Sequence, residues 1–151
     1  MTQISLKVAA GLWLIWGLVH AAAAGVIVIS GDATAGFQAI GDGVDPAALV
    51  ADYHPAVGAV LNQHAWNLLW GGLVTMVGAV FIAKGSVGAI FICALVGGLL
   101  DVGYFTFIDL GGFANFVPGT IMTIVSATAI IVSFGAYYLG GLRTASADGA
   151  S

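Results

Sequence analysis

The stretch VGAIFICALVGGLLDVGYFTFI, residues 87–108, decides the fold. It carries one charged residue, the acid Asp101, among mainly apolar ones. A run of this length and composition is typical of a helix that crosses a membrane. Because an acid inside such a helix costs roughly 3 kcal/mol to insert, we expect Asp101 to face protein or water and to have a polar partner.

The composition of the whole chain agrees with a membrane protein. Of its 151 residues, 60% are hydrophobic and only 7% are charged, which is more apolar surface than a soluble chain of this length can bury. Three basic residues stand against seven acidic ones, so the chain has no basic patch for nucleic-acid binding. The one cysteine, Cys93, permits no intrachain disulfide.

Three further apolar runs can cross a membrane, so the sequence predicts an all-α integral membrane protein: an antiparallel bundle of four transmembrane helices with a structured outer loop. Residues 1–151 form a single membrane domain in this interpretation. A cleavable signal peptide is the alternative for the first run, but its apolar residues continue past the alanines to Ile29, which favours a retained helix. The expected spans are 6–29, 64–83, 87–108 and 117–139, with an outer connection at 30–63 and a tail at 140–151.

The long connection between the first two spans contains a helix signal of its own. Asp45 followed by Pro46 is typical of a helix N-cap and first turn, which predicts a short helix over 46–53 on the outer surface. The residues that its apolar spacing turns toward the bundle are Leu49, Val50 and Tyr53. Residues 56–63 are apolar enough to lie in the membrane interface or to extend the second span. A connection of this length serves as a lid or binding loop, or as a cap over the helix ends.

The basic residues indicate how the chain is oriented. Four spans place both termini and the turn at Lys84 on one side of the membrane, and Lys7 and Arg143 fall on that same side. The long connection, which holds four aspartates, falls on the other side. By the positive-inside rule we expect a multi-pass protein of the inner (plasma) membrane with cytoplasmic N- and C-termini.

Each span carries a polar residue in the half of the membrane next to the long connection. From the helical rise, His20 lies roughly 14 Å and Asp101 roughly 11 Å below the outer ends of their spans, so the two side chains can pair. The sequence predicts a ligand- or proton-binding site made by His20, Asp101, Asn67, Thr123, Ser126 and Tyr104. Its expected rim consists of His64, His54 and Trp66.

Two interpretations of these polar residues stay open. Ionisable residues inside a membrane helix are functional by default, which favours a polar site. Alternatively, His20 and Asp101 form a structural pair that fixes helix register, and the Ser and Thr side chains only bond carbonyls of their own helix. His54 and His64 are expected at an aqueous rim, where an imidazole need not be a ligand.

The sequence contains no known catalytic, phosphate-binding or metal-binding motif, so no metal site is predicted and the cofactor stays unidentified. The expected depths of His20 and His64 differ by roughly 10 Å, which disfavours a haem held by both. A zinc or copper site made by His54 and His64 has no clear third ligand.

Three classes of function fit this architecture. The first is a small-molecule binding or transport module with a protonatable His20–Asp101 site, which leads because the polar residues cluster at one depth. The second is a membrane redox or lipid-modifying enzyme, or a subunit of one, with a quinone-like substrate. The third is a structural accessory subunit of a membrane complex. The expected partners are the lipid bilayer, a small-molecule ligand and a second copy of the chain, bound through the Gly/Ala ridge of Gly17, Ala21 and Gly25.

Overall fold

The computed structural model describes residues 2–39, 47, 49–113 and 116–140. The regular structure of these residues is all helical, and they contain no β-strand. Four helices are long and apolar enough to cross a membrane, which confirms that part of the sequence prediction. They are α1 (Thr2–Ser30), α3 (Pro55–Ala83), α4 (Val87–Tyr104), which continues as the π-helix η1 (Phe105–Asp109), and α5 (Ile121–Leu139).

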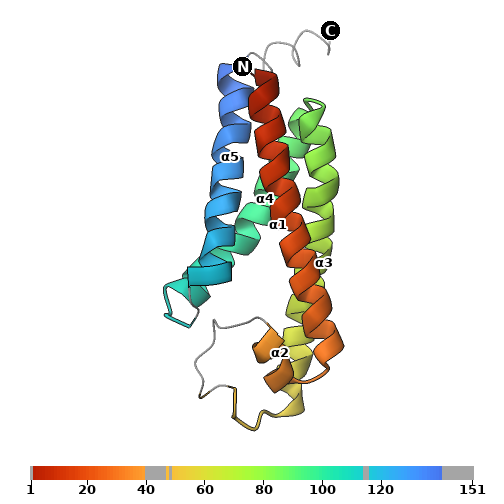
Figure 1. Cartoon of the computed structure of the whole chain (residues 1–151), viewed down its shortest axis with the longest axis vertical. Helices are drawn as coiled ribbons and strands as arrows, with labels where there is room; N and C mark the ends of the chain where they lie inside the picture. Colours follow the sequence, from red (N-terminus) through yellow and green to blue (C-terminus); the bar gives the residue numbers. More distant parts are fainter. Residues whose placement is uncertain (1, 40–46, 48, 114–115, 141–151) are drawn as a thin grey trace.

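Helices α1, α3 and α5 run along the long axis of the molecule, and α4 runs obliquely behind α1 (Figure 1). The start of α1, the end of α5 and the turn between α3 and α4 lie at one end of the molecule, here called the Lys84 end. The short helix α2 (Ala33–Ala39) and η1 lie toward the other end, here called the Asp109 end. Both α1 and α4 pack against α3 and α5, so α1 and α4 face each other across the middle of the structure.

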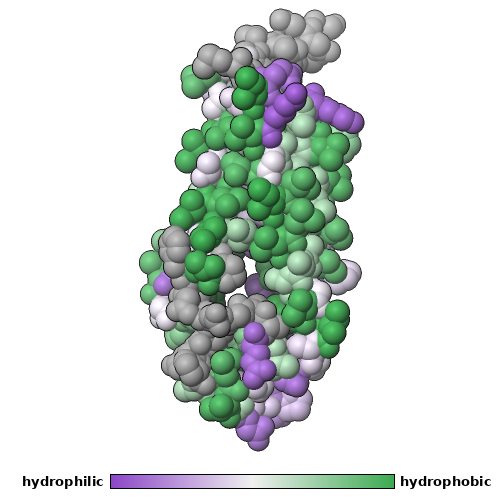
Figure 2. Space-filling view, viewed as in Figure 1, coloured by the Kyte–Doolittle hydropathy of each residue, from purple (hydrophilic) through white to green (hydrophobic). Residues whose placement is uncertain are grey.

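The side surface of the long helices is apolar. Figure 2 shows hydrophobic side chains over most of the visible face along these helices, with hydrophilic ones gathered toward the two ends. Large apolar side chains that are strongly exposed include Leu99, Val102 and Ile131. An apolar surface of this extent suits contact with lipid.

Helix α3 begins earlier than predicted, at Pro55 rather than at residue 64. Pro55 occupies the first turn, where its missing N–H needs no partner. The Nδ1 atom of His54 accepts a hydrogen bond from the Ala56 N–H at 3.2 Å and caps the helix. Residues 56–63 therefore extend the helix, which is one of the two conformations that the sequence left open.

The predicted helix over 46–53 is wrong for the residues that the structure describes. Residues 49 and 50 form a turn and a bend, and residues 51–53 have no regular secondary structure. Val50, which was expected to face the bundle, is 85% exposed. The residue before Pro55 avoids the helical region of backbone conformation, so a helix would have to end before His54. The stretch that remains is short for a helix. The Asp45–Pro46 pair that suggested the helix lies outside the described residues.

The short helix of this connection is α2. Asp32 caps it, since its Oδ1 atom accepts a hydrogen bond from the Ala35 N–H at 2.7 Å. Helix α2 packs against α1 and α3, and the rings of Phe37 and Tyr53 contact each other with centroids 5.3 Å apart. Tyr53 is therefore half-buried against α2 and does not depend on a helix of its own.

The link between α4 and α5 is irregular. The chain leaves η1 and returns through η2 (Phe116–Thr120), in which Val117 has a non-helical φ of −109° and ψ of 132°. Val117 precedes Pro118, and a residue before proline favours an extended backbone. The Thr120 hydroxyl donates to Asp109 Oδ1 at 3.0 Å and ties the two segments together. Regular helix therefore resumes later than the predicted start at residue 117.

Close packing between α1 and α3 depends on two glycines. A Cβ atom added to Gly17 would lie 2.6 Å from the Gly72 carbonyl oxygen, and one added to Gly72 would lie 2.6 Å from the Gly17 carbonyl oxygen. Ala21, the next residue of the same ridge, also lies against Gly72. This part of the Gly/Ala ridge therefore packs within the chain.

Replacing Gly17 tests whether this close approach stabilises the fold. Gly17→Ala forces a methyl group against backbone atoms of α3, so we expect the free energy of unfolding to fall by roughly 1–3 kcal/mol. Gly11→Ala, on the same helix, is the control, because nothing lies within 4 Å of the added Cβ and alanine favours a helix. Thermal unfolding in detergent should show a lower Tm for Gly17→Ala only. Equal changes in Tm would contradict the packing argument.

Candidate functional site

Helix α1 turns a column of three ring side chains toward α4. Trp13, Trp16 and His20 follow one another at helical spacing, and both indoles are fully buried. The rings of Trp16 and His20 stack with centroids 3.8 Å apart. Opposite Trp13, α4 carries Gly97, where a Cβ atom would overlap the indole. The column reaches across the middle of the structure because α4 has no side chain at that point.

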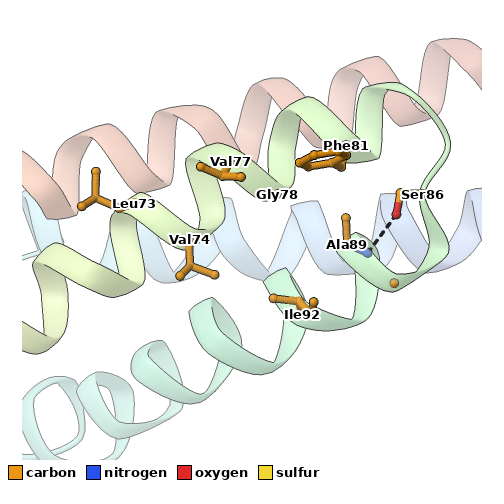
Figure 3. A pocket seen from close by; sticks show the side chains of 9 residues that line it. Leu73, Val74, Val77, Gly78, Phe81, Ser86, Ala89 and Ile92 are labelled. Carbon is orange, nitrogen blue, oxygen red and sulfur yellow. Dashed lines mark hydrogen bonds between the residues drawn. The ribbon is translucent and has the colours of Figure 1, made fainter.

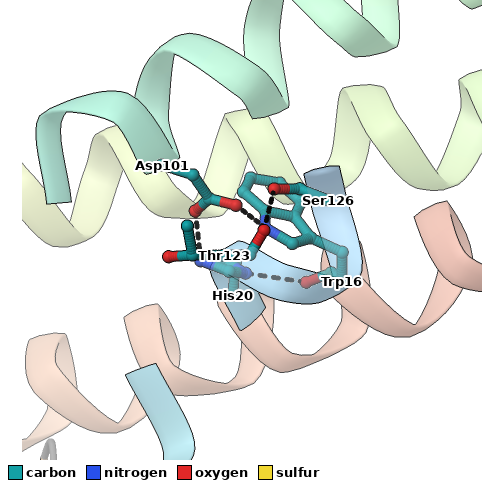
Figure 4. A network of polar contacts seen from close by, with 5 residues as sticks. All are labelled: Trp16, His20, Asp101, Thr123 and Ser126. Carbon is teal, nitrogen blue, oxygen red and sulfur yellow. Dashed lines mark hydrogen bonds and ion pairs between the residues drawn. The ribbon is translucent and has the colours of Figure 1, made fainter. Parts of the chain in front are cut away.

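Asp101 is the charged centre of the site. It lies one turn beyond Gly97 on α4 and is only 4% exposed. Its Oδ2 atom accepts a hydrogen bond from the Trp16 Nε1–H at 2.7 Å, and its Oδ1 atom lies 3.8 Å from His20 Nε2 (Figure 4). The second distance is within ion-pair range but longer than a hydrogen bond. The structure thus brings Asp101 and His20 together and adds the Trp16 indole as a hydrogen-bond donor to the carboxyl group.

The surroundings of His20 fix which ring nitrogen carries a proton. Its Nδ1 atom lies 2.8 Å from the Trp16 carbonyl oxygen, which can only accept, so Nδ1 is the donor. A neutral ring then presents an unprotonated Nε2 to Asp101 Oδ1. Two acceptors that face each other in a buried site repel, so a proton on either Nε2 or the carboxyl group stabilises the pair. The geometry therefore allows one proton to be held by either residue of the pair.

Helix α5 supplies two hydroxyl groups beside Asp101, those of Thr123 and Ser126 (Figure 4). The Ser126 hydroxyl donates to the Thr123 carbonyl oxygen at 3.0 Å and also lies against the Asp101 carboxyl group. The Thr123 Oγ1 atom is buried and has no hydrogen-bond partner within the described part of the chain. Both residues line a cavity of about 150 Å³ between α4 and α5, and Asp101 lines it too.

Other buried hydroxyl groups bond their own helices. The Thr75 hydroxyl donates to the Gly72 carbonyl oxygen at 2.9 Å, and the Ser133 hydroxyl donates to the Ala129 carbonyl oxygen at 2.6 Å. For these residues the purely structural interpretation of Ser and Thr holds. Thr123 differs from them, because its hydroxyl has no such bond.

Two residues that the sequence placed in the site have other neighbours. The Asn67 side-chain oxygen accepts a hydrogen bond from the Trp70 Nε1–H at 3.2 Å, on its own helix and at the surface. The ring of Tyr104 lies over Gly119, where a Cβ atom would overlap the phenol hydroxyl. Tyr104 therefore packs against η2, and Asn67 belongs to the surface of α3.

The three predicted rim residues lie at or after the start of α3. His54 caps that helix, and Trp66 is 62% exposed. His64 is exposed as well, but it is close enough to His20 for their charges to interact.

Two further features bear on where a ligand could bind. Among the residues that the structure describes, no three His, Cys, Asp or Glu side chains are grouped to hold a metal ion. A larger hollow of about 510 Å³ lies between α3 and α4 near the Lys84 end (Figure 3). Its lining is apolar apart from Ser86, whose hydroxyl accepts the Ala89 N–H that begins α4. Of these two cavities, the smaller one is therefore the one lined by an ionisable side chain, that of Asp101.

Comparisons with known proteins identify no relative of this chain. No family model matches the chain, and searches of curated proteins and of solved structures gave no match. What the site can do has to follow from its own atoms.

Sequence reasoning missed Trp16 as a donor to Asp101. The signal was present, because Trp16 lies one turn before His20 and therefore shares its face and nearly its depth. A buried indole has an N–H group that needs an acceptor. A tryptophan next to a buried histidine is thus itself a candidate partner for a buried acid.

A double-mutant cycle tests the contact between Trp16 and Asp101. Trp16→Phe removes the N–H donor and Asp101→Ala removes its acceptor, so each single change should lower the free energy of unfolding. The double variant should lose less than the sum of the two. We expect a coupling energy of roughly 0.5–3 kcal/mol from thermal unfolding in detergent.

Trp13→Phe is the matched control for this cycle, because the Trp13 Nε1 atom is buried and has no partner among the described residues. It loses the same part of the ring but no hydrogen bond, so its effect should add to that of Asp101→Ala. Equal coupling in the two cycles would mean that packing, rather than the hydrogen bond, links Trp16 to Asp101.

Proposed function

We propose that the chain is an integral protein of the inner (plasma) membrane, folded as an antiparallel bundle of four transmembrane helices. In this arrangement both termini and the Lys84 end face the cytoplasm, and the Asp109 end faces outward. Support comes from the four long apolar helices and from their apolar side surface. The orientation is supported by the basic residues Lys7, Lys84 and Arg143, which a four-span topology gathers on one side.

Within this bundle, Trp16, His20 and Asp101 form a site that binds one exchangeable proton and serves the binding or transport of a small molecule. The observation that carries the proposal is the orientation of His20, whose Nδ1 is held by the Trp16 carbonyl so that Nε2 faces Asp101. With one shared proton the pair is neutral, and without it the pair has a net negative charge. A net charge is costly in a buried site, so loss of the proton requires a ligand or a structural change that compensates for it.

The cavity between α4 and α5 gives this site room for a ligand. By the helical rise, Asp101 lies roughly 12 Å from Asp109, which places the cavity in the outer half of the proposed bundle. The segments next to it, η1 and η2, are irregular helices, and such segments are frequent at functional sites. A small molecule in this cavity would contact Asp101 directly.

A structural role is the second candidate, and one observation favours it. The hydrogen bond between Trp16 and Asp101 joins the two helices that face each other across the bundle, so it fixes their register. An accessory subunit whose polar core only specifies packing would use the same bond. That role needs Trp16 and Asp101, whereas a proton-binding site also needs His20 to titrate together with Asp101.

A histidine titration separates the two candidates. In a His54→Asn, His64→Gln background His20 is the only histidine, and an asparagine preserves the helix cap. Nitrogen NMR should find Nδ1 protonated at every pH, with the titration confined to Nε2. Asp101→Asn should move the midpoint of the His20 titration by at least about one pH unit, because the proton is shared.

Asp109→Asn, at the end of η1, is the matched control and should move that midpoint far less. An unchanged midpoint in Asp101→Asn would show that His20 and Asp101 hold no common proton, and the structural candidate would then stand. Loss of the proton from Nδ1 would contradict the bond to the Trp16 carbonyl on which the proposal depends.

The orientation is tested by cysteine labelling in a Cys93→Ala background. Val50→Cys, in the exposed part of the long connection, should react with a membrane-impermeant thiol reagent in intact cells. Ser146→Cys, in the C-terminal tail, should react only after the cells are opened. The reverse pattern would place the termini outside and remove the proposed orientation.

A further inference from the structure

The hollow between α3 and α4 is an apolar groove in the side surface of the helices (Figure 3). It is here called the α3–α4 groove, and its lining includes Leu73, Val77 and Phe81 of α3 and Gly88 and Ile92 of α4. Val77, Phe81 and Ile92 are 59%, 49% and 52% exposed, so the groove is open along its side. In the proposed arrangement this opening faces lipid.

The length of the α3–α4 groove matches one leaflet of a bilayer. From Lys84 to Leu73, its innermost residue on α3, the helical rise is roughly 16 Å. The hydrocarbon core of a bilayer is about 30 Å thick, so one leaflet contributes roughly 15 Å. A lipid acyl chain ends near the middle of the bilayer, whereas a transmembrane helix of a partner would need a groove about twice as long. The groove therefore fits an acyl chain better than it fits a partner helix.

The volume and the lining of the groove also suit a hydrocarbon chain. A protein cavity of about 150 Å³ holds a molecule of benzene, so the 510 Å³ of the groove hold roughly twenty carbon atoms, which is the size of one acyl chain. Ser86 is the polar side chain of the lining, and its hydroxyl already accepts the Ala89 N–H. Beneath the groove Cys93 lies directly over Gly78, so the two helices touch and close its floor.

A cation lies at the end of the groove. The Lys84 ammonium group is 5.8 Å from the centroid of the Phe81 ring, which lines the groove, and this is within the range of a cation–π contact. The charged residues that the structure describes at the Lys84 end are basic, Lys7 and Lys84, and none of the described aspartates lies there. An anionic group above the groove would therefore meet a positive charge and no negative one.

The turn that contains Lys84 adds to this preference. The N–H groups of Gly85 and Ser86 donate to the Ile82 and Phe81 carbonyl oxygens at 2.9 and 3.0 Å, so they occupy acceptors at the end of α3. Helix α4 begins directly after the turn, and the positive end of its dipole favours an anion. The ammonium group and the start of α4 thus lie on either side of the groove's end.

We propose that the α3–α4 groove binds one acyl chain of an anionic phospholipid from the leaflet at the Lys84 end, and that the lipid phosphate lies at Lys84. The inference goes beyond the proton-binding site and rests only on the proposed insertion in a membrane. Clusters of basic residues next to transmembrane helices attract anionic headgroups in the same way, and each basic residue near the surface strengthens binding roughly fivefold.

The test uses phosphatidylglycerol and phosphatidylcholine with the same acyl chains and the same nitroxide label on one chain. The full chain is placed in phosphatidylcholine nanodiscs, and either labelled lipid is added as a minor component. The nitroxide broadens the NMR signal of a methyl group that it approaches. We expect labelled phosphatidylglycerol to broaden the Ile92 signal roughly fivefold more than labelled phosphatidylcholine does. Ile131, which is 71% exposed on α5, is the reference and should respond equally to both lipids.

Variants at the turn locate the headgroup. Lys84→Gln should remove the preference for phosphatidylglycerol at Ile92, and Lys84→Arg should keep it, because the charge is retained. Lys7→Gln is the matched control, since it removes the same charge from the same end of the molecule but from α1, which does not line the groove. It should leave the preference at Ile92 unchanged.

A variant on α4 locates the acyl chain. Gly88→Leu places a side chain inside the groove, and an added Cβ atom there meets nothing within 4 Å, so the fold should tolerate the change. The broadening at Ile92 by phosphatidylglycerol should fall to the level of phosphatidylcholine. Gly103→Leu is the matched control, because Gly103 is equally open on the same helix but lies outside the groove.

Equal broadening of Ile92 by the two labelled lipids would overturn the inference. An equal response to Lys84→Gln and Lys7→Gln would replace the site with a general attraction of anionic lipid to this end. Protection of Ile92 from both lipids, with two chains in each nanodisc that Gly88→Leu separates, would overturn it in favour of a second copy of the chain. Both leaflets of a nanodisc hold the same lipids, so the outcome does not depend on the proposed orientation, and the His20 titration tests the proton-binding site separately.

Discussion

A carboxyl group in the middle of four apolar helices must have a partner, and the hydrogen bond from Trp16 Nε1 to Asp101 Oδ2 meets that requirement. The bond joins α1 and α4, each of which packs mainly against α3 and α5, so its geometry depends on where all the long helices lie. One turn away, the Trp13 indole fills the space that Gly97 leaves open. The contact of Trp13 with Gly97 and the hydrogen bond of Trp16 to Asp101 together fix the register of α1 against α4.

Small residues make this arrangement possible. Where α1 crosses α3, Gly17 and Gly72 allow the two backbones to touch, which holds the ring column of α1 over the middle of the structure. The sequence analysis expected the Gly/Ala ridge to bind a second copy of the chain. At Gly17, however, this ridge packs against α3 of the same chain. Gly25, further along the ridge, has nothing within 4 Å of an added Cβ, so self-association through this ridge would have to use that part.

The four long apolar helices could be predicted because the length and hydropathy of a segment are read directly from the sequence. Similar depths for His20 and Asp101 could be predicted because the helical rise per residue is constant. The sequence could not decide the start of α3, since residues 56–63 are apolar enough for a helix or an interface. It placed the helix of the connection after Asp45, whereas the described helix there is α2, which Asp32 caps. The roles of Asn67 and Tyr104 depend on how each helix is rotated, which only tertiary packing sets.

Asp101 is packed more tightly on one side than on the other. This difference bears on whether the residue has only a structural role or belongs to a binding site. On the α1 side, Trp16 and His20 are stacked and bonded. On the α5 side, a cavity remains and the Thr123 hydroxyl is buried without a protein partner in the described part of the chain. A core that only fixed register would gain stability by filling that cavity and by bonding that hydroxyl. The α1 side therefore holds the acid in place, and the α5 side leaves unfilled space beside it.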